Sequence, residues 1–243
     1  YTGSTTHQPS AVVFIAGWKV PRGRVCTVTR PAEPLPVPKH VADLAGDREV
    51  TAVWLNDLGG VTFSLAGEEF VKVYPEQHAA LLVAEAERMT WAIEYHSVPT
   101  ILSTGPGWLH TAALPGRSAV DPDWIRRPRT ATRAIAQGLR LLHNAAPVEA
   151  CPYGTPSWIP ADAPPADRLV VCHGDPHPGN LLEVPHPRPG APTGYVWVDP
   201  DGFLCEPEYD LGVVLRGFNR LILAAPDPVV TLRSWCAVLA EAT

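Results

Sequence analysis

VVCHGDPHPGNLL, residues 170–182, is the most informative stretch of this chain. Apolar residues open and close it, and a turn stiffened by glycine and proline lies between them. The polar members of that turn are His173, Asp175, His177 and Asn180. Loops held between rigid elements are common places for chemistry. The stretch therefore predicts a functional loop, with side chains suited to metal binding or to proton transfer.

Composition limits the classes of protein to consider. The chain has 243 residues, of which 46% are hydrophobic and 18% charged, as in a globular protein with one large domain or two lobes. Its net charge of −6, without a run of Lys or Arg, predicts no nucleic-acid partner. The apolar residues 11–17 are too few to cross a membrane, so no membrane partner is expected.

The cysteines indicate the compartment. There are five, an odd number, and none forms a C-x-x-C pair. This pattern argues against a disulfide framework or a cysteine zinc site and predicts a cytoplasmic protein. The chain begins with Tyr1 rather than Met, so no native terminus is inferred, and the oligomeric state is left open.

Hydrophobic periodicity predicts strands in the first half and helices in the second. The first 45 residues are an extension without an assigned structure. The elements expected after it are strands at 50–55, 61–65, 69–74 and 108–114 with a helix at 76–95, then a helix at 129–144, strands at 169–172, 181–184 and 195–198, and a helical tail at 208–240. This order predicts an α+β fold of two lobes, 1–113 and 114–243.

Phosphoryl transfer requires a lid over the phosphates, a lysine that contacts them, carboxylates that hold a metal and a group that positions the nucleophile. Protein kinases supply these parts in a fixed chain order, ending with an Asn five residues after the catalytic Asp and an Asp-containing turn. This chain has the same order in Gly59-Gly60, Lys72, Glu85, His173-Gly174-Asp175, Asn180 and Asp199.

Each part alone has an ordinary structural interpretation. Lys72 could be a solvated lysine on an edge strand, and Glu85 a carboxylate on a helix surface. Asp199 and Asp201 could be simple turn formers in their D-P-D-G sequence. The shared order of the whole set favours the functional interpretation.

HGDPHPGN, residues 173–180, resembles the catalytic loop of the aminoglycoside phosphotransferase family, kinase-like enzymes that phosphorylate small molecules. The likeness extends to the glycine hairpin at 57–63, to 85–91 and to LHTAALPG at 109–116, and it spans roughly residues 41–220. VDPDGFLCEPEYDLG, residues 198–212, is most similar to the streptomycin 6-kinase and hydroxyurea-phosphotransferase branch.

The resemblance implies a protein-kinase-like fold with an N-terminal nucleotide-binding lobe and a mainly helical catalytic lobe. It implies ATP, or GTP, and Mg²⁺ as cofactors, and an aminoglycoside hydroxyl as acceptor. Asp175 would orient the hydroxyl and take its proton, while Asn180 and Asp199 would hold Mg²⁺. Lys72 would contact the phosphates and be held by Glu85.

The remaining roles follow from the same resemblance. Gly59 and Gly60 would let the backbone approach the nucleotide, and the strand from Thr111 to Ala113 would offer backbone groups to adenine. His173 and Asp210 would support the catalytic loop. Asp201, the additional carboxylate of D-P-D-G, would share or replace a metal contact.

The chain departs from the family between residues 154 and 172. Typical antibiotic kinases carry a long helical insert there that supplies acidic residues, whereas this stretch is short and rich in proline and alanine. The acceptor therefore stays open between an aminoglycoside and another small metabolite or natural-product intermediate.

Two further hypotheses compete with the kinase interpretation. His173, Asp175 and His177 form an H-x-D-x-H run that is typical of metal-dependent hydrolases, although that class leaves Lys72 and Glu85 unexplained. A nucleotide-binding protein without catalysis is the other, and the intact Asp175 argues against it.

Overall fold

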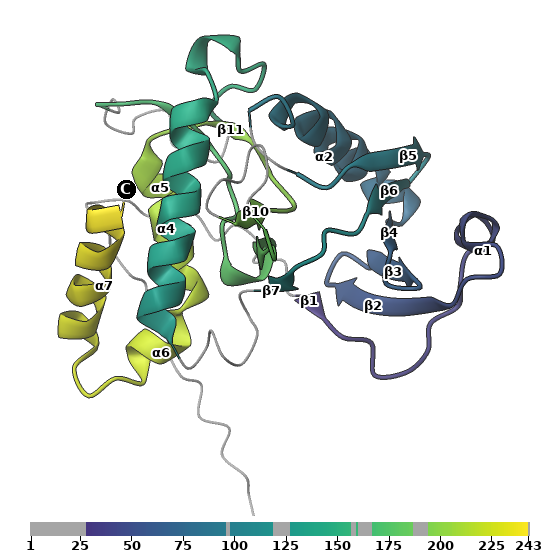
Figure 1. Ribbon diagram of the computed structural model, residues 1–243, viewed down its shortest axis with the longest axis horizontal. Coiled ribbons are helices and arrows are strands. Elements are labelled where there is room, and N and C mark those ends of the chain that lie inside the picture. The colour runs from purple at the N-terminus through teal and green to yellow at the C-terminus, as the bar shows by residue number, and fades with distance from the viewer. Residues whose placement is uncertain are drawn as a thin grey trace, which may run out of the picture.

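The first half of the chain is built on an antiparallel sheet (Figure 1). The computed structural model describes residues 28–95, 98–118, 127–156, 159, 167–186 and 194–242. The sheet has six strands in the order β1-β2-β3-β4-β6-β5. They are β1 Val28–Thr29, β2 Val50–Asn56, β3 Val61–Leu65, β4 Glu69–Val73, β5 Ile101–Gly105 and β6 Trp108–Ala112.

Helices cover both faces of this sheet. They are α1 Lys39–Ala45 and α2 Ala79–Ala92, the second preceded by a 3-10 turn, η1 Glu76–His78. Val41 of α1 packs on one face in a cluster with Phe63 and Val71. Met89 of α2 packs on the other face, in a cluster that includes Leu109 of β6. Each face of the sheet thus buries apolar side chains against a helix.

The alternation of side chains along β4 decides where Lys72 points. Successive residues of a strand face opposite sides of the sheet. Val71 is fully buried in the cluster on the α1 face. Lys72 is paired in register with Leu109, which packs against α2. The lysine side chain therefore leaves the sheet on the side of α2.

The second half is mainly helical. Its helices are α4 Pro128–Ala145, α5 Pro207–Gly217, α6 Asn219–Leu223 and α7 Pro228–Ala242. Proline is suited to the first position of a helix because it lacks an N–H that would be unpaired there, and α4, α5 and α7 all begin with it. Ile135 and Leu139 of α4 form the centre of the core together with Val214 and Leu239.

Short strands lie between the helices and the large sheet (Figure 1). β8 Val170–Cys172 pairs with β11 Phe203–Cys205, and β9 Leu181–Glu183 lies between β10 Tyr195–Trp197 and β7 Arg117–Ser118. Two short 3-10 turns, η2 Val148–Ala150 and η3 Pro178–Asn180, complete this half. The stretch at 170–182 therefore runs from the end of β8 to β9.

The α+β fold agrees with the sequence prediction. Several boundaries of helices and strands differ from the predicted ones. The helix expected at 76–95 starts with η1 and ends at Ala92, and the strand expected at 108–114 ends at Ala112. β5 and β11 were not predicted, and α1 lies in the extension that was left unassigned. The helical tail is divided into α5, α6 and α7. The part of the predicted extension at residues 1–27 lies outside the described residues.

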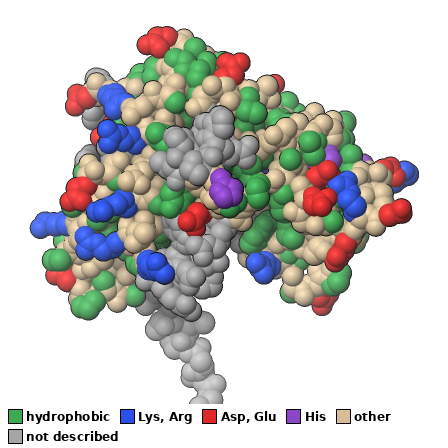
Figure 2. All heavy atoms as spheres, viewed as in Figure 1, with side chains coloured by type: hydrophobic (Ala, Val, Ile, Leu, Met, Phe, Trp, Pro, Cys, Tyr) green, Lys and Arg blue, Asp and Glu red, His purple; other side chains and the backbone are tan. Residues whose placement is uncertain are grey.

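The surface carries charges of both signs. On the face drawn in Figure 2, Lys and Arg are interspersed with Asp and Glu, without a large area of one sign. None of the described helices is long and apolar enough to cross a membrane. The described cysteines, Cys151, Cys172, Cys205 and Cys236, are free thiols.

A polar cluster joins four segments of the first half. Glu69 Oε2 of β4 lies 2.9 Å from Arg48 Nη1, after α1, and 2.8 Å from His110 Nε2 of β6. The other ring nitrogen of His110 lies 3.1 Å from Ser103 Oγ of β5. Burial alone would raise the pKa of Glu69, but the hydrogen bonds from His110 and Arg48 and their charges lower it below its ordinary value of 4.5.

This cluster predicts a pH dependence of stability. A carboxyl group with a lowered pKa in the folded state stabilises it above pH 4.5, and this contribution is lost as the pH falls through the lowered value. We expect Glu69→Gln to reduce the free energy of unfolding at pH 7 by up to about 1 kcal/mol, the size typical of accessible ion pairs. Urea unfolding of both proteins at pH 7 and at pH 3 measures this loss in the free energy of unfolding. The loss should shrink at pH 3, and exposed Glu68→Gln is the matched control; an equal loss at both pH values contradicts the prediction.

Candidate active site

Lys72 lies between two carboxylates from different parts of the chain. Its Nζ is 2.7 Å from Glu85 Oε1 of α2 and 2.8 Å from Asp199 Oδ1, which follows β10. The side chains of Lys72 and Glu85 are 17% and 15% exposed, whereas that of Asp199 is 50% exposed. The structure therefore brings together three of the residues predicted from the sequence, with Asp199 on the accessible side.

The charges in this group shift one another's pKa values. Burial would lower the pKa of Lys72, but Asp199 and Glu85 raise it well above its usual range, so the ammonium stays charged. Burial raises the pKa of Glu85 to about 7 despite the opposing charge of Lys72. For Asp199 the cost of partial desolvation is exceeded by the attraction of Lys72, and its pKa is lowered. Asp199 is thus the carboxylate that remains ionised most readily.

The glycine hairpin between β2 and β3 is held at its base. Asn56 Oδ1 accepts hydrogen bonds from the N–H groups of Leu58 and Gly60 at 3.1 and 2.7 Å. Asn56 Nδ2 donates to the hydroxyl of Tyr74 at 2.8 Å. A Cβ on Gly60 would lie 2.2 Å from the Tyr74 ring, and Gly59 has φ +78°, so both positions require glycine. The hairpin is therefore a compact, anchored turn rather than a long flap.

Asp210 fixes the start of the loop that follows β8. This residue of α5 is fully buried. Its Oδ2 accepts from the backbone N–H of His173 at 2.8 Å and lies 2.9 Å from His143 Nε2, and its Oδ1 accepts from the N–H of Gly174 at 2.9 Å. The carboxylate therefore holds the loop through its backbone.

His173 links the loop to the turn that carries Asp199. Burial lowers the pKa of His173, although the surrounding carboxylates oppose this, so the ring is neutral. In that form Nε2–H donates to the carbonyl of Val198 at 3.1 Å, and Nδ1 accepts from the N–H of Asp175 at 3.3 Å. The ring also packs on Trp197, with centroids 4.8 Å apart. His173 is thus a structural residue, with both ring nitrogens engaged.

The backbone of the loop and the turn are hydrogen bonded to each other. The N–H groups of Asp201 and Gly202 donate to the carbonyl of His173 at 2.9 and 3.2 Å. The N–H of Val198 donates to the carbonyl of Asn180 at 2.9 Å. Gly174 has φ +90°, and a Cβ there would lie 2.6 Å from the Cβ of Asp201. The loop and the turn therefore form one rigid unit.

Asp175 lies on this unit with its carboxylate accessible. Its side chain is 35% exposed. Its Oδ1 accepts from Nη2 of Arg216, on α5, at 3.3 Å, and its Oδ2 lies 3.7 Å from His177 Nε2. Arg216 was not predicted, because nothing in its separation of 41 residues from Asp175 indicates a contact. Arg216 limits the orientations that the carboxylate can adopt.

Asn180 and Asp199 provide the oxygen ligands that Mg²⁺ prefers. Asn180 is buried, and its Nδ2 donates to the carbonyl of Asp175 at 3.0 Å, so Oδ1 is the atom of this amide that can bind a cation. Asp199 has φ +55°, an uncommon conformation for a residue other than glycine. At neighbouring Asp201, desolvation of the carboxylate by the surrounding protein, together with the charges of Asp175 and Asp199, raises its pKa to about 6. The donor set fits Mg²⁺.

The predicted adenine segment continues β6. Thr111 pairs with Phe70 of β4, and the N–H of Ala113 donates to the carbonyl of Glu68 at 2.8 Å. The backbone donor at Ala113 is thus engaged within the sheet. What Ala113 can present to a ligand is its carbonyl group.

The geometry argues against the hydrolase alternative. Both ring nitrogens of His173 are hydrogen bonded to the backbone, and Nδ1 of His177 accepts from the N–H of Gly179 at 3.0 Å. Among the described residues, the group of side chains close enough to share a metal is His143, Cys172 and Asp210. It is buried, and Asp210 already accepts three hydrogen bonds. H-x-D-x-H is therefore not arranged as a metal site.

Known proteins include relatives of this chain by sequence. No family model matches the chain. It is 29% identical over 175 residues to an aminoglycoside 3'-phosphotransferase of Streptomyces ribosidificus, covering 53% of this chain and 66% of that protein. It is 28% identical over 185 residues to an aminoglycoside 3'-phosphotransferase of Streptomyces fradiae, covering 55% and 68%. The matched region thus spans about two thirds of the length of these relatives.

Solved structures share the fold. Aminoglycoside phosphotransferase APH(3'')-Id from Streptomyces rimosus superposes with a TM-score of 0.62 at 21% identity, covering 83% of this chain and 88% of that one. The same protein in complex with ADP and streptomycin gives a TM-score of 0.56 at 19% identity, covering 82% and 88%. The kinase-like fold expected from the sequence is confirmed, and both kinds of comparison support the aminoglycoside phosphotransferase family.

The position of Asp210 predicts a large effect of a small change. In Asp210→Asn, an NH₂ group replaces one oxygen and faces a backbone N–H, which leaves a buried donor without a partner. We expect a loss of about 2 kcal/mol in the free energy of unfolding, measured by urea denaturation.

The matched control is Glu208→Gln, an exposed position on the same helix, which should change stability by less than about 0.5 kcal/mol. Equal stability of Asp210→Asn and the unaltered chain would show that the hydrogen bonds to the loop are not needed for its conformation.

Proposed function

We propose that this chain, whose relatives in sequence and fold are aminoglycoside phosphotransferases, is an ATP- and Mg²⁺-dependent small-molecule O-phosphotransferase. In this proposal the γ-phosphate of ATP moves to a hydroxyl group of an aminoglycoside-type antibiotic. Phosphoryl transfer depends mainly on positioning and on stabilising charge, so the proposal is judged by what the described side chains can hold and orient.

One observation carries the proposal. Lys72 bridges Glu85 and Asp199, and Asp175 lies on the loop whose backbone is hydrogen bonded to the turn of Asp199. A phosphate-binding cation, a metal-binding carboxylate and a proton acceptor are thus fixed relative to one another. A metal-dependent hydrolase does not need a lysine between these two carboxylates.

The nucleotide is proposed to bind beside the glycine hairpin. Gly59 and Gly60 allow its backbone to approach the phosphates, while the segment from Thr111 to Ala113, at the junction of the proposed lobes, would offer backbone groups to adenine. The Lys72 ammonium binds the α- and β-phosphates, and Glu85 keeps it in place. Asn180 and Asp199 would hold Mg²⁺, which neutralises phosphate charge when bound.

The acceptor is proposed to react at Asp175. Its carboxylate accepts the hydrogen bond of the attacking hydroxyl, aligns it with the γ-phosphate and takes its proton. The hydrogen bond from Arg216 and the support of its backbone by His173 keep the carboxylate oriented. Fixed orientation of reacting groups is a main source of rate acceleration in such sites.

The names of the relatives support an aminoglycoside acceptor, and the complex of the Streptomyces rimosus protein contains ADP and streptomycin. A different hydroxylated metabolite or natural-product intermediate is the second candidate, because residues 154–172 lack a dense set of acidic residues. A panel of aminoglycosides that includes streptomycin, each tested with ATP and with GTP, separates these options.

Removing the proposed base gives the direct test of the reaction. We expect Asp175→Asn to lower the turnover of ATP-dependent phosphorylation by about 10²- to 10⁴-fold, the usual contribution of a general base. Nucleotide binding should survive, because Asp175 is not among the groups proposed to hold it. At a hundred times its dissociation constant the nucleotide stabilises the fold by about 2.7 kcal/mol, which a thermal-shift assay detects.

Asp43→Asn is the control for Asp175→Asn, since Asp43 is an exposed carboxylate on α1 that pairs with Lys39. Near-normal turnover by Asp175→Asn, or the absence of a thermal shift with any nucleotide in the unaltered chain, would contradict the proposed function.

Replacing the proposed phosphate ligand should act on the nucleotide. We expect Lys72→Met to raise the KM for ATP at least tenfold, on the order of one lost charge-assisted contact of 1.5 kcal/mol. Steady-state kinetics at varied ATP measures this, and Lys39→Met, which alters an exposed lysine, is the control. An unchanged KM for ATP in Lys72→Met is incompatible with a role of Lys72 at the phosphates.

A further inference from the structure

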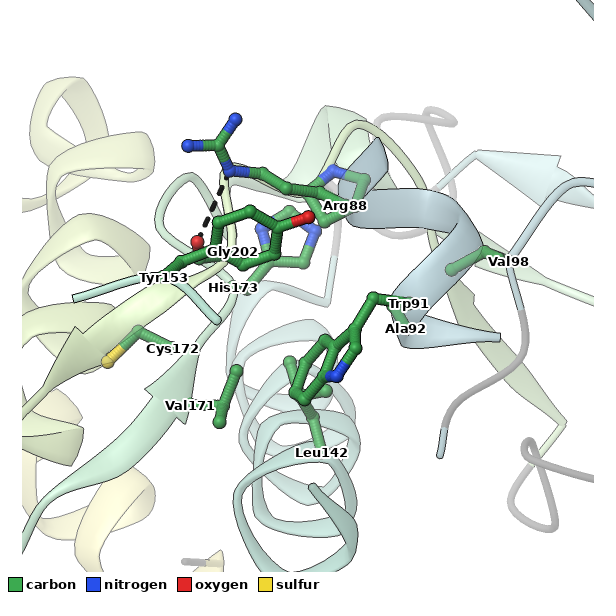
Figure 3. A pocket seen from close by; sticks show the side chains of 11 residues that line it. Arg88, Trp91, Ala92, Val98, Leu142, Tyr153, Val171, Cys172, His173 and Gly202 are labelled. Atoms are coloured by element: carbon green, nitrogen blue, oxygen red, sulfur yellow. Dashed lines mark hydrogen bonds between the residues drawn. The ribbon is translucent and has the colours of Figure 1, made fainter. Parts of the chain in front are cut away.

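Arg88 connects α2 to the turn that carries Asp199. Its Nε donates to the carbonyl of Gly202 at 3.3 Å, across a separation of 114 residues in sequence (Figure 3). Arg88 lies three residues after Glu85, which is one turn of the helix. The same helix face thus offers Glu85 to Lys72 and Arg88 to the turn. Sequence analysis did not identify Arg88, although this spacing was the available signal.

The side chain of Arg88 is held along its whole length. Its stem packs on Gly202, where a Cβ would lie 3.5 to 3.8 Å from Arg88 Cδ, Cγ and Cβ. Its guanidinium group lies over the ring of Tyr153, 4.8 Å from the centroid, as Figure 3 shows. A guanidinium that stacks on an aromatic ring loses little freedom when it donates a hydrogen bond. Arg88 is therefore preorganised for the contact with Gly202.

The charge of Arg88 also acts on the carboxylate of Asp201, whose pKa it lowers, and the cavity beside Arg88 is mainly apolar. A small cavity between α2 and the start of the catalytic loop is lined by Trp91, Val98, Leu142 and Val171, and Arg88 and His173 also border it (Figure 3). Apolar contacts hold surfaces together without fixing their direction. The hydrogen bond from Arg88 to Gly202 supplies the directional contact between α2 and the turn at this place.

The turn is strained and therefore depends on outside support. Asp199 and Gly202 have φ values of +55° and +48°. A left-handed conformation in a residue other than glycine persists where its surroundings hold it. The catalytic loop holds the turn through the His173 carbonyl, which accepts from the N–H groups of Asp201 and Gly202. Lys72 of β4, which is paired with Glu85 of α2, holds Asp199 as well.

We propose that Arg88 is a positioning residue that holds the D-P-D-G turn against α2, so that Asp199 keeps its place relative to Lys72. The inference rests on the proposed function, because the consequence of the contact is the placement of the metal-binding carboxylate. Arg88 does not contact the reacting groups in this account. It acts through Gly202 and sets the geometry of the turn as a whole.

The first test measures, without any substrate, the mechanical link between α2 and the turn, which is the contact of Arg88 with Gly202. Arg88→Met keeps an apolar stem and removes the guanidinium group. Arg88→Lys keeps the positive charge but replaces the planar guanidinium with an ammonium group. We expect amide hydrogen exchange of residues 201 and 202 to be about tenfold faster in Arg88→Met, with a smaller increase in Arg88→Lys. Exposed Glu87→Gln on the same helix is the matched control and should leave the exchange unchanged.

The second test measures the consequence for the reaction. We expect Arg88→Met to lower kcat by about 10- to 100-fold, the range expected when a reacting geometry is displaced, and to raise the Mg²⁺ concentration needed for half-maximal activity. The KM for the acceptor should stay within twofold. A residue with a merely structural role would reduce the amount of folded protein without changing the Mg²⁺ requirement, and urea unfolding of each variant measures that amount.

The outcomes separate the two proposals. Unchanged hydrogen exchange in Arg88→Met overturns the link between α2 and the turn. Faster exchange with unchanged kcat and Mg²⁺ requirement overturns the positioning role. If the unaltered chain phosphorylates no acceptor while Arg88→Met still exchanges faster, the proposed function fails and the mechanical link stands.

Discussion

The ammonium group of Lys72 is the interaction on which the candidate site depends. It joins a strand of the large sheet to α2 through Glu85 and to the second half of the chain through Asp199. One cation between two carboxylates leaves an excess negative charge, and buried charges are costly unless they are paired. Burial raises the pKa of Glu85, whereas the attraction of Lys72 exceeds the cost of desolvation at Asp199 and lowers its pKa. The excess is suited to a divalent cation beside Asp199, the more exposed of the two carboxylates.

Prediction from the sequence succeeded where local periodicity carries the information. The pairing of Lys72 with Glu85 was implied by the family resemblance, and it agrees with the alternation along β4, which fixes the face on which Lys72 lies. The glycine hairpin and the strands around residues 170–182 are likewise determined by short-range signals. The position of Asp199 follows from the order of the motifs rather than from any local pattern.

Two of the elements that were missed, β11 and α1, depend on contacts distant in sequence, whereas β5 pairs with β6, the next strand along the chain. β11 has three residues, too few to show a period, and it exists because it pairs with β8. α1 follows Pro38, which provides no side-chain cap, and it is stabilised by packing of Val41 on the sheet. The contact of Arg216 with Asp175 spans 41 residues and has no sequence signal. Tertiary packing decides such features.

The two halves of the candidate site are each organised by one helix. α2 supplies Glu85 to Lys72 and Arg88 to Gly202, so it fixes the ammonium group of Lys72 relative to the turn. α5 supplies Asp210 to the backbone of the catalytic loop and Arg216 to the carboxylate of Asp175. Because these contacts converge on backbone groups and on side chains of the candidate site, they constrain the geometry of that site. A fold built in this way can keep that geometry while loops elsewhere change, so the reaction and the acceptor are argued from the residues of the site rather than from likeness in fold.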